Sequence, residues 1–210
     1  MRIIYLHGFA SSPQSNKAQF FRRRFLDAGI DVAIPALDAG DFEHVTITGQ
    51  LQVIDREVKS QSRSCTAMMG SSLGGYLAAL YAARNPAAVE KLILMAPAFE
   101  FPRRWKARYS EADIENWRKQ GSVQIFHYGY KEPRPLSYDL VEDSQRYEND
   151  PDFHQSALIF HGDHDDVVPV ELSESFVARH PNVRLKRFSS GHELTDVLEE
   201  MWQETKAFLR

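Results

Sequence analysis

The chain has 210 residues, 43% of them hydrophobic and 26% charged, which is enough to bury a core without disulfide or metal support. A formal net charge of −4 gives no reason to expect a nucleic-acid partner, and no apolar run is long enough to span a membrane. The single cysteine, Cys65, excludes an internal disulfide and is expected to be a small core residue. We therefore expect one cytoplasmic domain covering residues 1–210.

Short apolar runs alternate with amphipathic segments along most of the chain. Six runs are expected to be strands: residues 2–7, 31–37, 64–70, 91–97, 156–162 and 182–188. Helices are expected from Ser15 to Gly29, around Leu51 to Val58, from Leu73 to Asn85, around Leu172 to Ala178, and from about His192 to Leu209. Strands that are apolar throughout are typical of a parallel sheet covered on both faces. Strand–helix alternation of this kind predicts a three-layer α/β fold.

One interval, residues 99–153, breaks this rhythm. It is rich in Arg, Tyr, Trp and Pro, and only one helix (110–121) and a short strand (123–128) are expected in it. An insertion of this length above the C-terminal edge of a parallel sheet would act as a lid. Its aromatic side chains either line an apolar acyl site or form the lid's own core: Phe99, Phe101, Trp105, Tyr109, Trp117, Phe126, Tyr128 and Tyr130. We also hypothesise that the basic side chains after the fourth strand contact an anionic group of the substrate: Arg103, Arg104 and Lys106.

The stretch Gly70-Ser71-Ser72-Leu73-Gly74 fits the pattern G-x-S-x-G with Ser72 at the serine position. Ser71 does not fit, because Met69 stands where its glycine is needed. The pattern lies between an apolar strand and a leucine-periodic helix. A sharp strand-to-helix turn there exposes one hydroxyl in a strained conformation, and only glycine leaves room on either side. Ser72 is therefore a candidate nucleophile.

A serine hydroxyl needs a base, and the base needs an acid that orients it. Asp165 follows the strand at 156–162, and His192 follows the last expected strand. Both lie where a parallel α/β sheet holds its sites, at the C-terminal ends of strands. Asp163 and Asp166 are alternatives for the acid, and Asp165 is favoured because D-x-V-V-P then leads into the next helix.

The first turn completes this set. His7-Gly8 follows the first strand directly, so the backbone is able to approach Ser72 closely. The N–H groups of Phe9 and Leu73 would then form an oxyanion hole. His7 is expected to brace the loop rather than take part in the chemistry.

At these residues the chain resembles the α/β-hydrolase superfamily. The start YLHGFASSP and the elbow GSSLGGY are similar to those of small bacterial serine esterases, and the lid and acid regions resemble abhydrolase-domain acyl thioesterases. The resemblance implies a minimal six-stranded parallel sheet in the order 2-1-3-4-5-6, with Ser72, Asp165 and His192 as the triad. It also implies Phe9 and Leu73 as the oxyanion donors.

The expected activity is hydrolysis of a small-molecule acyl ester or thioester through an acyl-enzyme, with no cofactor and no metal. A metallohydrolase is the first alternative, because five residues of metal-ligand type occur within HGDHDD: His161, Asp163, His164, Asp165 and Asp166. A non-catalytic binding protein on a hydrolase fold is the second, although such proteins typically lose a triad member.

Overall fold

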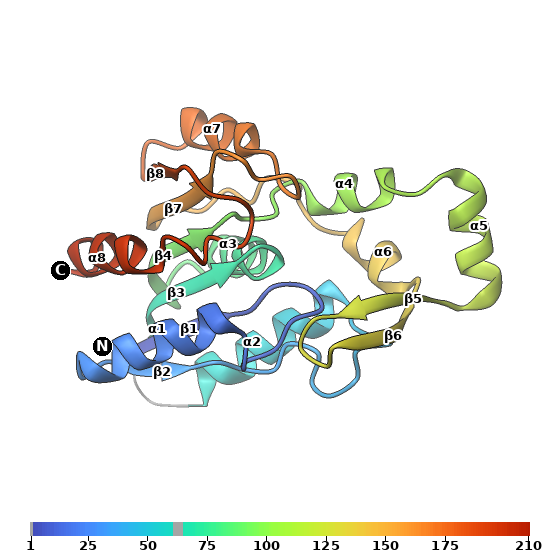
Figure 1. The fold of residues 1–210 in the computed structure, drawn as a ribbon, viewed down its shortest axis with the longest axis horizontal. Helices are drawn as coiled ribbons and strands as arrows, with labels where there is room; N and C mark the ends of the chain where they lie inside the picture. Colours follow the sequence, from blue (N-terminus) through green and yellow to red (C-terminus); the bar gives the residue numbers. More distant parts are fainter. Residues whose placement is uncertain (1, 61–64) are drawn as a thin grey trace.

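A computed structural model describes residues 2–60 and 65–210 of the chain. Six parallel strands form one sheet in the order β2-β1-β3-β4-β7-β8 (Figure 1). They are β1 (Arg2–Leu6), β2 (Asp31–Ala33), β3 (Cys65–Ser71), β4 (Val89–Met95), β7 (Ser156–Gly162) and β8 (Val183–Phe188). The six expected strands and their order are confirmed, although β2 is shorter than expected. Cys65 opens β3, but its side chain lies outside the described part of the structure, so its expected burial stays a prediction.

Helices cover both faces of the sheet. On one face lie α1 (Asn16–Asp27) and α8 (Leu198–Leu209), and on the other lie α2 (Ile47–Lys59), α3 (Leu73–Arg84) and α7 (Val170–Arg179) (Figure 1). Along β1, Ile3 and Tyr5 pack toward α1 and α8, while Ile4 and Leu6 pack toward the other layer. Successive side chains of a strand point to opposite faces, and so both sets must be apolar here.

The helix ends follow local chemistry. Ser15 caps α1, because its Oγ accepts the N–H of Ala18 at 3.4 Å. The last helix was expected from about His192, and this was wrong, because α8 begins at Leu198. The residues before it form a loop in which Leu194 adopts a φ of 52° and Ser190 Oγ donates to Asp196. His192 therefore lies on a loop rather than on a helix.

The segment between β4 and β7 holds more regular structure than its sequence indicates. It contains α4 (Phe101–Ala107), α5 (Glu111–Gln120), the antiparallel pair β5 (Ser122–His127) and β6 (Glu132–Ser137), and α6 (Asp139–Ser144). The expected helix and strand correspond to α5 and β5. Strand β6 has two prolines and does not read as a strand, but proline is tolerated in a two-stranded pair, where both strands are edges. Figure 1 shows these elements together at one side of the main sheet.

None of the helices in the described ranges combines the length and the apolar character that crossing a membrane requires.

Candidate active site

Ser72 occupies a sharp turn between β3 and α3. Its backbone has φ 53° and ψ −118°, a conformation that costs energy in a residue with a side chain. The turn is held in place because the Ser72 N–H donates to the Met95 carbonyl at 2.9 Å. A Cβ at Gly70 would lie 2.2 Å from the Gly74 carbonyl oxygen, and a Cβ at Gly74 would lie 2.2 Å from that of Leu6. Both glycines of the motif are therefore required by close backbone approach.

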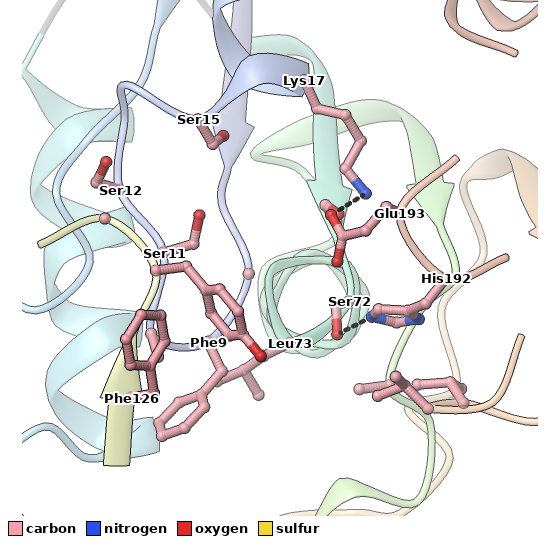
Figure 2. A pocket seen from close by; sticks show the side chains of 18 of the residues that line it. Phe9, Ser11, Ser12, Ser15, Lys17, Ser72, Leu73, Phe126, His192 and Glu193 are labelled. Atoms are coloured by element: carbon pink, nitrogen blue, oxygen red, sulfur yellow. Dashed lines mark hydrogen bonds and ion pairs between the residues drawn. The ribbon is translucent and has the colours of Figure 1, made fainter. Parts of the chain in front are cut away.

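The structure brings Ser72, His192 and Asp165 together from three separate loops (Figure 2 shows the first two). The Nε2 of His192 lies 3.1 Å from the Ser72 Oγ, and its Nδ1 lies 2.8 Å from the Asp165 Oδ2. A carboxylate only accepts hydrogen bonds, so Nδ1 carries the proton. The Nε2 lone pair is then free to accept the hydroxyl proton of Ser72. This is the relay that activates a serine.

Asp165 is held from several directions. Its Oδ1 accepts the N–H groups of Val167 at 2.9 Å and Val168 at 2.7 Å. Its Oδ2 also lies 3.2 Å from the Nε2 of His161, in a fully buried contact. Burial by itself raises the pKa of the carboxyl, but hydrogen bonds from His161, His192 and Val168 outweigh it and hold the pKa well below its usual range. Asp165 therefore stays charged beside His192.

The other acid candidates face elsewhere. Asp163 is engaged at the surface by Arg187, with 2.6 Å between Oδ1 and Nε, and Asp166 is exposed. Of the five polar residues of HGDHDD, only His161 and Asp165 are in contact, and the described ranges contain no group of three or more His, Cys, Asp or Glu side chains placed to hold a metal ion. The metallohydrolase alternative gains no geometric support.

The first loop lies against the Ser72 turn. A Cβ at Gly8 would sit 3.5 Å from the Cβ of Ser72, so the two backbones are nearly in contact. Phe9 and Leu73 both line the cavity beside Ser72, and neither backbone N–H has a hydrogen-bond partner among the residues that the structure describes. Two unpaired donors close to the Ser72 hydroxyl have the geometry that an oxyanion hole requires.

His7 braces this loop. Its Nδ1 donates to the Gly8 carbonyl at 3.0 Å, and its Nε2 accepts the N–H of Leu37 at 3.2 Å. Burial lowers the pKa of the ring and favours the neutral form that these two bonds need. The side chain ties the loop after β1 to the segment that follows β2, as its sequence position suggests.

Ser72 opens into a cavity of about 1150 Å³. The segment between β4 and β7 contributes apolar lining, including Phe101, Trp105, Tyr109, Ile125 and Phe126. The loop between β1 and α1 contributes polar lining; Figure 2 shows Ser11 and Ser12 beside Phe126, and Lys17 and Glu193 on another side of Ser72. The expected aromatic set therefore divides. Phe101, Trp105, Tyr109, Phe126 and Tyr128 line the cavity, Phe99 and Trp117 are buried in the core, and Tyr130 is exposed outside the cavity.

The three basic residues after β4 also divide. Arg104 lines the cavity and donates to the Val167 carbonyl at 2.8 Å, while Arg103 pairs with Glu100 outside it. Lys106 is exposed and does not line the cavity.

Three residues that sequence reasoning did not connect with the site are His161, Lys17 and Glu193. His161 was considered only as a metal ligand, and nothing in the sequence places Lys17 near Ser72.

The sheet order, the covering helices and the turn at Ser72 define an α/β-hydrolase fold. The model of one family, described as Uncharacterised protein family (UPF0227), matches residues 2–210, and the chain belongs to that family. No curated protein matches it in sequence.

Solved structures share the fold at low identity. Alpha/beta hydrolase domain-containing protein 10 from mouse has a TM-score of 0.82 at 17% identity, with 99% of this chain and 89% of that one covered. Est1E from Butyrivibrio proteoclasticus, in a structure with ferulic acid bound, has a TM-score of 0.83 at 21% identity, covering 99% and 87%. The monoacylglycerol lipase of Paleococcus ferrophilus has a TM-score of 0.75 at 15% identity, covering 99% and 93%. At these identities the likeness establishes the fold.

Proposed function

We propose that the protein is a serine hydrolase that cleaves carboxylic esters or thioesters of small molecules. The observation that carries the proposal is the continuous contact from Ser72 Oγ through His192 to Asp165, at 3.1 and 2.8 Å. This contact lies at the wall of a large cavity, where a substrate has room to bind. The likeness to esterases and a lipase supports the proposal at the level of the fold.

In this mechanism His192 takes the proton of Ser72 as the hydroxyl attacks the acyl carbon. Asp165 holds the imidazole in the required tautomer and stabilises its charged form. The N–H groups of Phe9 and Leu73 stabilise the tetrahedral oxyanion. His192 then gives its proton to the leaving alcohol or thiol, and water cleaves the acyl-enzyme through the same groups.

Residues 99–153 act in this proposal as the lid of a single domain that covers residues 1–210. Five of their aromatic side chains line the cavity and would hold the acyl chain. Phe9 packs edge-on against Trp105 at 4.8 Å between ring centroids, so the lid is in direct contact with the oxyanion loop. The lid therefore both shapes the acyl site and supports an oxyanion donor.

The proposal is tested by ester hydrolysis as a function of pH. The purified protein should hydrolyse p-nitrophenyl esters of short acyl chains, with kcat/KM decreasing on the acid side along a slope of about one on a log scale. A slope of one corresponds to a single group that must be unprotonated, because Asp165, whose pKa is held well below its usual range, stays charged and adds no second protonation. A slope near two, or no hydrolysis of any ester or thioester in a graded series, would contradict the proposal.

A further inference from the structure

The buried cation Lys17 lines the cavity and reaches toward Glu193, beside Ser72 and His192 (Figure 2). It is the second residue of α1, and its side chain is 8% exposed. Its Nζ makes no hydrogen bond with any residue in the described ranges, and its one ion pair, with the Glu193 Oε2, is long at 3.8 Å. The Glu193 side chain is 76% exposed. Burying an ammonium is costly, and burial lowers the pKa of Lys17 despite the charges of Glu193 and Asp165, so the exposed Glu193 carboxylate at this distance compensates only in part.

A second polar group in the same region also has no partner. Tyr5 lines the cavity and is 1% exposed, and its hydroxyl has no hydrogen-bond partner in the described part of the chain. Burial first, and then the charge of Glu193, raise the pKa of Tyr5, which places its hydroxyl in the field of that carboxylate. Buried polar groups normally have hydrogen-bond partners. The Tyr5 hydroxyl and the Lys17 ammonium, both near Glu193, are therefore placed to donate to an acceptor group of a ligand.

The charges of the residues that line the cavity also favour a ligand with an anionic group. The lining includes four cations, Lys17, Arg104, Arg108 and Lys131, and one carboxylate, Glu193. The protein as a whole has a net charge of −4, so positive charge is concentrated in this cavity; three of the four cations belong to the segment between β4 and β7, and only Lys17 lies on α1. A cavity of one sign attracts ligands of the opposite sign. Lys17 is the only one of the four that is buried.

The position of Lys17 indicates which part of a substrate it would contact. The leaving group takes its proton from His192, so it must depart on the His192 side of the acyl carbon. Glu193 follows His192 directly, and Figure 2 shows Lys17 reaching toward Glu193 on this side of Ser72, away from Phe9, Leu73 and Phe126. The side of the cavity that Phe9 and Phe126 line is thus left for the acyl chain (Figure 2).

We propose that the preferred substrates are esters or thioesters whose leaving group carries a carboxylate or phosphate, bound by Lys17 and Tyr5 in place of Glu193. The inference rests on the proposed serine hydrolysis and adds the charge and the orientation of the substrate. The products are an apolar acid and an alcohol or thiol that carries the anion and has been protonated by His192.

The test compares matched esters by kcat/KM. The pairs are 3-carboxyphenyl butyrate with its neutral methyl ester, 3-phosphonooxyphenyl butyrate with phenyl butyrate, and phenyl hydrogen glutarate, which carries the anion on the acyl side, with phenyl pentanoate. Wild-type protein should prefer the anionic member of the first two pairs only, and the larger preference identifies the anion as carboxylate or phosphate.

Lys17→Met should reduce this preference by about 10- to 100-fold, the range expected for a hydrogen bond to a charged group. Tyr5→Phe, which removes a single oxygen from the core, should reduce it in the same direction. Glu193→Gln should increase it, because the competing carboxylate is removed. The control Lys119→Met removes a surface lysine on α5 that pairs with Glu115, and it should leave the ratio unchanged.

The variants distinguish two roles for Lys17: binding the anion of the substrate, and holding the His192 loop in place. If Lys17 only held Glu193 and the His192 loop in place, Lys17→Met and Glu193→Gln would lower both esters of a pair equally, and the inference would be overturned. A preference for the anionic glutarate ester would overturn the assigned orientation. If wild type cleaved the neutral esters without any preference for an anion, this inference would fail and the proposed function would stand. If it cleaved none of the esters, the proposed function itself would fail.

Discussion

Ser72→Ala should lower kcat for ester hydrolysis by on the order of 10⁶-fold if the three side chains act as a unit. The variant keeps the backbone turn, because the turn is held by the Ser72 N–H bond to Met95 and by the two flanking glycines rather than by the hydroxyl. Its fold and melting temperature should therefore be close to those of wild type. The measurement is the initial rate with a p-nitrophenyl ester, at enzyme concentrations high enough to detect the residual activity.

The neighbouring serine provides a matched control. Ser71 is the last residue of β3 and is buried, and it differs from Ser72 by one position in the same motif. Ser71→Ala should retain most of the activity. If Ser72→Ala hydrolysed esters at a rate close to that of wild type, Ser72 would not be the nucleophile.

Asp165→Asn should lower kcat by about 10⁴-fold, with little change in structure. The Oδ1 of Asp165 accepts two backbone N–H groups, so the amide oxygen of an asparagine must take that place. The amide nitrogen then faces the Nδ1 of His192 and donates to it. This forces the proton of the ring onto Nε2, which is no longer able to accept the proton of Ser72.

The same substitution changes the dependence of stability on pH. The pKa of Asp165 in the folded protein is below its unfolded value of about 3.9, so its ionisation stabilises the fold above that pH. This contribution to stability is lost as the pH falls through the pKa of Asp165 in the folded protein, and Asp165→Asn lacks it altogether.

The control Asp163→Asn breaks a surface pair with Arg187 and should retain most of the activity. If Asp163→Asn lost as much activity as Asp165→Asn, Asp165 would not be the acid of the triad.

The sheet and the Ser72–His192–Asp165 contact could be predicted because each depends on local patterns. Apolar runs mark β1, β3, β4 and β7, and strand–helix alternation fixes how parallel strands follow one another. The motif around Ser72 has a steric cause that the glycine contacts make explicit. Placing Asp165 and His192 after strands was enough to bring them to one edge of the sheet.

The cavity could not be predicted in the same way, because it is built by contacts between distant segments. Trp105 and Tyr109 line it while Trp117, on the next helix, is buried and donates to the Leu136 carbonyl at 2.9 Å. In the sequence, Trp105, Tyr109 and Trp117 are all large aromatic residues of the same segment, and nothing there separates the two that line the cavity from the one that is buried. Lys17 reads as a surface position of an amphipathic helix, and only the fold of the first loop places its ammonium beside the residue that follows His192.

The most direct test of the central claim, that Ser72 is a nucleophile activated by His192, is covalent labelling with a fluorophosphonate followed by peptide mapping. The account predicts one adduct, on Ser72, in wild-type protein, none in Ser72→Ala, and strongly slowed labelling in Asp165→Asn. Labelling of a different residue, or an absence of labelling in folded wild-type protein, would contradict it.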